Sequence, residues 1–168
     1  ISEEWLLDGK SLGVLFSSGL VGMAIGAIFL GRLADKYGRR ALVILCLSII
    51  TCGMLFSAFT ENLYQLSAMR VLTGLGIGGA LATVNIITAE YSSNKRRGLM
   101  IALIQIGYPI GGMIAAVVTA TLIPEAGWRS VFIFGASLSA LMIPVVIWRM
   151  PESIDYILSR RSVDALAR

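Results

Sequence analysis

The chain contains no histidine, and only 14% of its residues are charged. The lack of histidine excludes a Ser-His-Asp triad, most catalytic zinc sites and an imidazole proton relay within these residues. Soluble domains carry roughly 25% charged residues, so this low charge and the mean hydropathy of +0.82 are typical of a membrane protein. No nucleophile–base pair or metal-ligand cluster is visible. We therefore predict that the protein is not an enzyme and needs no cofactor or metal.

Cysteine is also scarce, and the net charge is a modest +4. Cys46 and Cys52 lie six positions apart in an apolar segment, which is not a same-face spacing on a helix. We expect both to be packed bundle residues, as free cysteines commonly are. The basic residues fall in short clusters between apolar runs, which fits membrane topology better than a nucleic-acid partner.

What the chain has in abundance is long apolar sequence. A membrane span needs about 20 mostly apolar residues, and runs of that order occur near 11–30, 41–60, 64–89, 98–123 and 130–149. The sequence predicts an all-α transmembrane helical bundle of five spans within residues 1–150. Residues 151–168 are predicted to begin a cytoplasmic loop and to form an amphipathic surface helix.

The loops between these spans differ in charge. One side has only Lys10 and Arg129, whereas eleven basic residues fall on the other: Arg32, Lys36, Arg39, Arg40, Lys95, Arg96, Arg97, Arg149, Arg160, Arg161 and Arg168. Cytoplasmic loops carry an excess of Lys and Arg, so we predict an N-terminus outside and a C-terminus in the cytoplasm. The sequence begins with Ile1 and shows no signal peptide, and we expect it to be a piece of a longer protein.

Glycine is the second abundant feature, with 18 residues. Gly22 and Gly26 form one Gly-x-x-x-Gly pair and Gly74 and Gly78 form another, a spacing that lets helix backbones approach closely in lipid. The pairs fit either a rigid bundle or surfaces that slide during transport. Pro109 is expected to kink the fourth span.

Several motifs flank the spans at specific places. Gly31-x-Leu33-x-Asp35-x-x-Gly38-Arg39-Arg40 joins the first two spans, and Arg70-x-x-x-Gly74-x-Gly76-x-Gly78 occupies the third. Glu90-Tyr91 precedes Lys95-Arg96-Arg97-Gly98, while Gly127-Trp128-Arg129 and Pro151-Glu152-Ser153 flank the last span. With these motifs, nearly the whole chain resembles the major facilitator superfamily.

The resemblance implies that the five spans are helices 2 to 6, most of the N-terminal half, of a twelve-helix secondary transporter. Within the superfamily, Arg70 to Gly79 and Gln105-x-Gly107-Tyr108-Pro109-x-Gly111-Gly112 look most like the aromatic acid:proton symporters. That group imports small aromatic or related carboxylates with protons across the bacterial inner membrane. Sugar porters share several of the motifs and stay the alternative. A channel would instead show a polar pore stripe.

The resemblance also implies a conformational latch at the cytoplasmic ends of the spans. Gly31 and Gly38 are expected to permit a tight turn that presents Asp35 to a helix N-terminus, where a negative charge is favourable. Arg39 or Arg40 is expected to pair with Glu90 at the end of the third span. The alternative is a simple basic anchor, although an anchor requires no acidic residue.

The candidate substrate-binding residues are Arg70, Gln105 and Tyr108. A basic residue within a span usually faces a cavity or a partner, so Arg70 is predicted to hold a substrate carboxylate or to pair with an acid on the absent helix 1. Its alternative is to snorkel to the interface. Gln105 and Tyr108 could bond to the substrate or to a neighbouring helix. The expected partners are thus an organic anion, protons, the bilayer, and the missing helix 1 and C-terminal half.

Overall fold

The protein is a bundle of four long helices, seen in a computed structural model that describes residues 8–93 and 95–150, with the side chains of 34–36 left out. The helices are α1 (Gly9–Tyr37), α2 (Arg39–Ser57), α3 (Leu63–Tyr91) and α4 (Arg97–Arg149). All four are long and apolar enough to cross a membrane. No strand occurs among the described residues. Apolar side chains dominate every helix. A helix forms its backbone hydrogen bonds within its own segment, as a segment surrounded by lipid must.

The turn between α1 and α2 is a single residue, Gly38. Its φ of 91° lies in the left-handed region that glycine adopts without steric cost. The expected tight turn is confirmed at Gly38, but Gly31 takes no part in it, because α1 continues through Gly31 to Tyr37 and α2 begins at Arg39. Gly31 instead faces α3, where a Cβ added to it would lie 3.4 Å from the Cβ of Ala82. Gly38 alone makes the turn.

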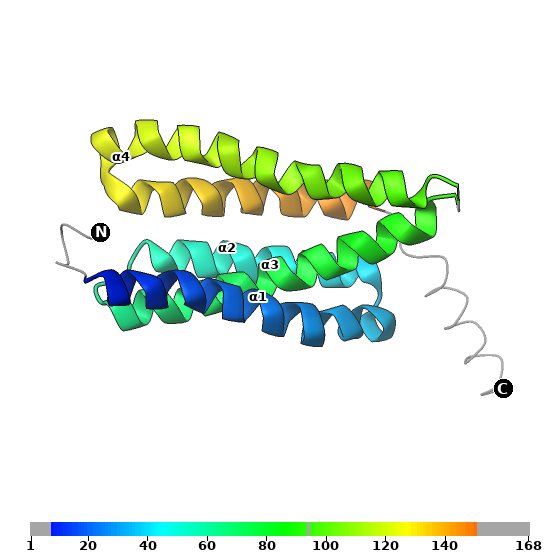
Figure 1. Ribbon diagram of the computed structural model, residues 1–168, viewed down its shortest axis with the longest axis horizontal. Helices are drawn as coiled ribbons and strands as arrows, with labels where there is room; N and C mark the ends of the chain where they lie inside the picture. The colour runs from blue at the N-terminus through cyan, green and yellow to red at the C-terminus, as the bar shows by residue number, and fades with distance from the viewer. Residues whose placement is uncertain (1–7, 94, 151–168) are drawn as a thin grey trace.

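The fourth and fifth predicted spans fall within one element, α4, which has 53 residues, so the structure has four elements where five spans were predicted. Gly127 interrupts its backbone with φ 73° and ψ 172°, and the chain reverses there, so that two arms run antiparallel (Figure 1). We call residues 97–126 the first arm and residues 128–149 the second arm. The break occurs at Gly127, whereas helical backbone angles continue through Pro109, where the kink was expected.

The bundle has two ends, which we name after Asp8 and Arg39 (Figure 1). At the Asp8 end, α1 and α3 begin and α4 reverses. At the Arg39 end, α1 and α3 finish, α2 begins, and both arms of α4 have their outer termini. The Asp8 carboxylate accepts a hydrogen bond from the backbone N–H of Gly9 at 2.8 Å, which marks the start of α1.

The closest packing in the bundle joins the parallel helices α1 and α3. A Cβ added at Gly22 or Gly26 would overlap the backbone of Val71 or Leu75, and one added at Gly78 would overlap the backbone of Met23. Both Gly-x-x-x-Gly pairs therefore bring backbone against backbone. In lipid this contact is stabilised by dispersion, because no hydrophobic driving force acts between helices.

The second seam joins α2 to the second arm of α4, which run antiparallel. Thr51 Oγ1 donates to Ser139 Oγ at 3.1 Å in the middle of this seam. One turn farther toward the Asp8 end, a Cβ added at Gly135 would lie 2.6 Å from Met54 Cε. Small and hydroxyl residues thus set the register of these two helices.

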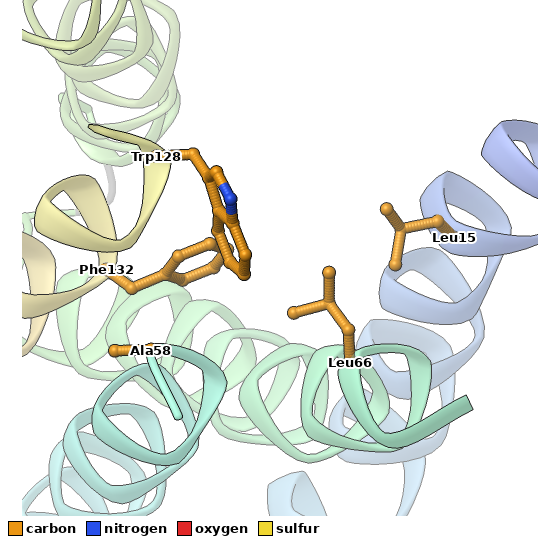
Figure 2. Packing of buried hydrophobic residues seen from close by; sticks show 5 residues of the cluster. All are labelled: Leu15, Ala58, Leu66, Trp128 and Phe132. Carbon is orange, nitrogen blue, oxygen red and sulfur yellow. The ribbon is translucent and has the colours of Figure 1, made fainter. Parts of the chain in front are cut away.

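Buried apolar residues form two clusters along the bundle. One, at the Asp8 end, comprises Leu15, Ala58, Leu66, Trp128 and Phe132 (Figure 2). The other comprises Leu30, Leu42 and Cys46. Cys46 is packed as expected, but Cys52 is exposed, so that part of the prediction is wrong. Six positions of separation place the two thiols on different helix faces.

Candidate functional site: the two ends of the bundle

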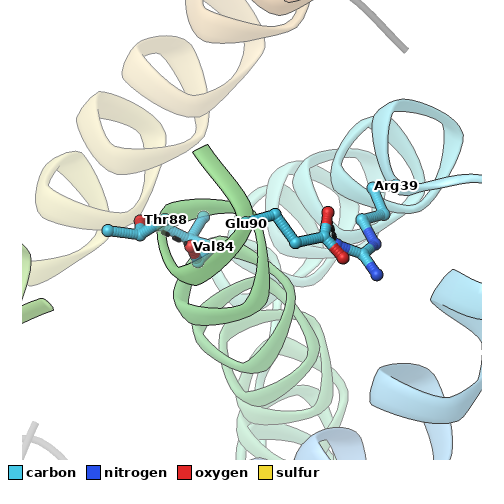
Figure 3. A network of polar contacts seen from close by, with 4 residues as sticks. All are labelled: Arg39, Val84, Thr88 and Glu90. Atoms are coloured by element: carbon cyan, nitrogen blue, oxygen red, sulfur yellow. Dashed lines mark hydrogen bonds and ion pairs between the residues drawn. The ribbon is translucent and has the colours of Figure 1, made fainter. Parts of the chain in front are cut away.

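An ion pair closes the Arg39 end of the bundle. The Arg39 guanidinium, at the first residue of α2, pairs with the Glu90 carboxylate near the end of α3 (Figure 3). Both side chains are largely buried, with 11% and 24% exposed. Burial weakens screening by salt, and so this pair is stronger than one on a surface. The sequence left Arg39 and Arg40 open as partners of Glu90, and the ion pair is made by Arg39.

Arg40 has a different partner. Its guanidinium donates to the backbone carbonyl of Ile147, close to the last residue of α4. The final carbonyls of a helix lack intrahelical donors, and a cation there is also favoured by the helix dipole. Arg39 and Arg40 thus tie the start of α2 to the ends of two different helices.

The remaining latch residues have mixed outcomes. Gly38 forms the turn that places both arginines. Gly31 lies within α1 and packs beside Ala82. The side chain of Asp35 lies outside the described residues, and its contact with a helix N-terminus stays a prediction.

Arg70 lies at the other end of the bundle, two turns into α3. Its guanidinium carbon sits 4.9 Å from the ring centroid of Phe132, on the second arm of α4. The ring is held in turn by Trp128, with ring centroids 5.8 Å apart and planes at 86°. Arg70 is half-buried. Within the described chain it therefore packs against an aromatic ring instead of extending along the helix to the interface.

Gln105 and Tyr108 lie apart from Arg70. Both are exposed on the first arm, Tyr108 by 57%, and neither has a hydrogen bond to Arg70 among the described residues. The three predicted substrate residues are thus not gathered into one site by this part of the chain. An open groove of about 530 Å³ is lined by α1 residues between Lys10 and Val21 and by Val71 of α3, and Arg70 is not among its lining residues.

Charged side chains are otherwise confined to helix ends. The acidic residues whose side chains are described are Asp8, Glu61, Glu90 and Glu125. Among the residues whose side chains are described, no group of three or more His, Cys, Asp or Glu gathers as a metal site would require.

Sequence reasoning missed Phe132. The signal that could have found it is depth: Arg70 is the eighth residue of α3, and Phe132 is the fifth residue of the second arm. Both helices run from the Asp8 end toward the Arg39 end (Figure 1). Similar depths on parallel helices make a cation and a ring candidates for contact.

Residues 1–165 match the sequence profile of the Major Facilitator Superfamily. The chain belongs to this superfamily. A gallate transporter of Pseudomonas putida is 33% identical over 162 residues, which are 96% of this chain and 36% of that protein. The 4-hydroxybenzoate transporter PcaK of Pseudomonas aeruginosa is 34% identical over 160 residues, 95% of this chain and 36% of the relative. These relatives are named as transporters, not enzymes.

The fold is similar to that of a solved superfamily member, the proton:xylose symporter XylE bound to 6-bromo-6-deoxy-D-glucose. The TM-score is 0.79 at 21% sequence identity, over 89% of this chain and 37% of the symporter. At this identity the likeness concerns the fold alone. The chain spans about a third of the length of the relatives it matches.

Proposed function

We propose that the whole protein imports small aromatic carboxylates together with protons, by alternating access across the bacterial inner membrane. The chain is an integral membrane segment of a superfamily whose matched relatives include gallate and 4-hydroxybenzoate transporters. The observation that carries the proposal for this chain is Arg70, a guanidinium half-buried well inside an apolar helix. An arginine binds a carboxylate with two parallel hydrogen bonds, which a lysine does not reproduce.

In this proposal the chain crosses the bilayer five times. A continuous helix of 53 residues would be about 80 Å long, whereas the hydrocarbon core is about 30 Å thick. The reversal at Gly127 instead gives each arm of α4 the length of one crossing. The crossings then correspond to helices 2 to 6 of the whole transporter. The excess of basic residues at the Arg39 end supports a cytoplasmic position for that end.

Arg70 would receive the substrate carboxylate, and Gln105 and Tyr108 would contact the substrate from the first arm. Arg70 lies about 10 Å along α3 from its first residue, which is inside the hydrocarbon core but short of its centre. The proton-carrying acid would lie outside the described chain, on the absent helix 1. This is consistent with the position of the described carboxylates at helix ends.

The Arg39–Glu90 ion pair would form the conformational latch together with Asp35. An ion pair that joins two helix ends can hold one arrangement of the bundle and break in another. Arg40 would hold the end of α4 through the Ile147 carbonyl. Breaking the latch should therefore alter transport without loosening α4.

The rest of the transporter would cover the first arm of α4. A Cβ added at Gly107, Gly111 or Gly112 would meet nothing within 4 Å in the described chain outside its own helix turn, and the apolar side chains around these glycines are exposed. Another helix can approach closely at such a place. Helix 1 and the C-terminal half are the proposed occupants, and they would enclose the substrate path that this chain cannot enclose alone.

Uptake of labelled 4-hydroxybenzoate by the full-length transporter in proteoliposomes tests the role of Arg70. Arg70→Lys should raise KM about tenfold or more, because the bidentate hydrogen bond is lost while the charge is kept. Arg129→Lys is the matched control, since Arg129 also stacks on a ring, Trp128 at 4.6 Å, but is exposed. An unchanged KM for Arg70→Lys would exclude the carboxylate role.

A further inference from the structure

The guanidinium of Arg70 meets a ring that belongs to another helix. Arg70 lies on α3 and Phe132 on the second arm of α4, and 4.9 Å separates the guanidinium carbon from the ring centroid. This distance is within the range at which a cation is attracted by the negative face of an aromatic ring. The contact joins two helices that otherwise touch little.

The ring of Phe132 is fixed by its surroundings. Only 5% of the residue is exposed, and Trp128 packs edge-on against it. Leu15, Ala58 and Leu66 complete the cluster from α1, the end of α2, and α3 (Figure 2). Moving the ring would disturb a contact among all four helices, so Phe132 is a rigid support for whatever rests on it.

The contact with the ring leaves the N–H donors of the Arg70 guanidinium available for a substrate. A guanidinium that stacks on a ring uses its planar face, while its N–H donors point outward in the plane. The aromatic ring does not neutralise the cation and accepts none of these in-plane donors. A carboxylate can therefore still approach the N–H edge of Arg70 and form two parallel hydrogen bonds.

We propose that Phe132 is a positioning residue for Arg70: its ring fixes the plane of the guanidinium, so that the N–H edge is presented to the carboxylate of the substrate. This inference rests on the proposed function, in which Arg70 binds that carboxylate. Phe132 does not touch the substrate. It lowers the entropic cost of binding, because a long side chain that is already ordered loses less freedom when the carboxylate binds.

The other arginine on a ring at the Asp8 end provides a contrast. Arg129 stacks on Trp128, its neighbour in sequence, and is exposed to its surroundings. Both residues of that stack lie on the same arm of α4. The ring under Arg70 is instead supplied by a different helix and lies within a buried cluster.

The test uses the full-length transporter and three ring variants. Phe132→Leu keeps an apolar side chain but removes the ring, Phe132→Tyr keeps the ring, and Phe134→Leu removes a partly exposed ring on the same arm. Uptake of labelled 4-hydroxybenzoate gives KM and kcat. Competition by 4-hydroxybenzamide, which lacks the negative charge, reports on binding without the carboxylate.

We expect Phe132→Leu to raise KM for 4-hydroxybenzoate about tenfold with kcat within about twofold, a loss in the range of one desolvated cation–ring contact. Inhibition by the amide should stay unchanged, Phe132→Tyr should restore KM, and Phe134→Leu should behave as wild type. An unchanged KM in Phe132→Leu, or an equal loss for acid and amide, would overturn the proposal.

A stability measurement keeps the test decisive if transport is lost. Melting temperatures of Phe132→Leu, Arg70→Gln and the double variant form a cycle that isolates their interaction. A double-variant shift smaller than the sum of the single shifts supports the stack, and additive shifts overturn it. If the wild type takes up no aromatic carboxylate, the proposed function fails, while this cycle still decides whether Phe132 holds Arg70.

Discussion

The glycines of α1 and α3 and those of the first arm of α4 share the same spacing but have opposite surroundings. A side chain at Gly26 or Gly78 would overlap the backbone of the facing helix, whereas Gly107 and Gly111 have nothing within 4 Å. The Gly-x-x-x-Gly spacing therefore shows where another helix can approach closely. It does not show whether a helix is packed there. The Gly-x-x-x-Gly pairs of α1 and α3 are packed against each other's backbones, whereas the glycines of the first arm face open space in the described chain.

The largest effect should come from a large side chain placed in the packed α1–α3 interface. We expect Gly26→Leu to abolish the folded transporter, because the backbone of Leu75 cannot move aside as a side chain could. The measurement is the yield of monodisperse protein in detergent. Gly13→Leu is the control, since Gly13 lies on the same helix and has open space around it. Similar yields of the two variants would contradict the contrast.

Breaking the ion pair at the Arg39 end should have the next largest effect. Glu90→Gln removes the charge that faces Arg39 and keeps the shape of the side chain. We expect a loss of about 1–3 kcal/mol, between the values for exposed and buried pairs, together with slower uptake. Urea or thermal unfolding and uptake are measured in parallel. Arg149→Gln, at the exposed end of α4, serves as the control for removing one charge.

A smaller loss is expected when the open face is filled. In the full-length protein Gly111→Leu should lower the melting temperature by less than Gly78→Leu. The described chain presents no backbone against Gly111, so the covering segments can adjust to the new side chain. Thermal unfolding of the two purified variants decides the matter. A loss as large as that of Gly78→Leu would show that the first arm also has a backbone partner.

The smallest effect should come from the hydroxyl pair of the second seam. Thr51→Val removes the hydrogen bond to Ser139 and keeps the shape of the side chain. Hydrogen bonds between membrane helices contribute about 0.6 kcal/mol on average, so we expect a shift of that order in unfolding experiments. A loss above about 2 kcal/mol would mean that this bond, and not the glycine packing, fixes the register.

The sequence was sufficient for the features that depend on composition and on the ends of the spans. Apolar runs predicted the helices, and the position of Glu90 at the end of one span predicted an arginine partner at the start of another. It was insufficient for the single-residue turn at Gly38, since two glycines in the motif could each permit a turn and only the structure shows that α1 continues through Gly31 to Tyr37. It also missed Phe132, because the contact with Arg70 depends on how two helices distant in sequence align in depth.

The division between Arg39 and Arg40 teaches the same lesson. The two residues are adjacent and identical in chemistry, so no sequence pattern separates a partner of Glu90 from a partner of the Ile147 carbonyl. The direction in which each side chain leaves the first turn of α2 decides it. Tertiary geometry thus assigns different roles to residues that the sequence treats alike.

The most direct measurement of the central claim is counterflow in proteoliposomes that hold the full-length transporter. Vesicles loaded with unlabelled 4-hydroxybenzoate should accumulate the labelled acid transiently, and an inward proton gradient should increase uptake. Vesicles loaded with xylose should not accumulate it. Labelled xylose exchanging against xylose, with no counterflow of 4-hydroxybenzoate, would contradict the account and identify a sugar porter.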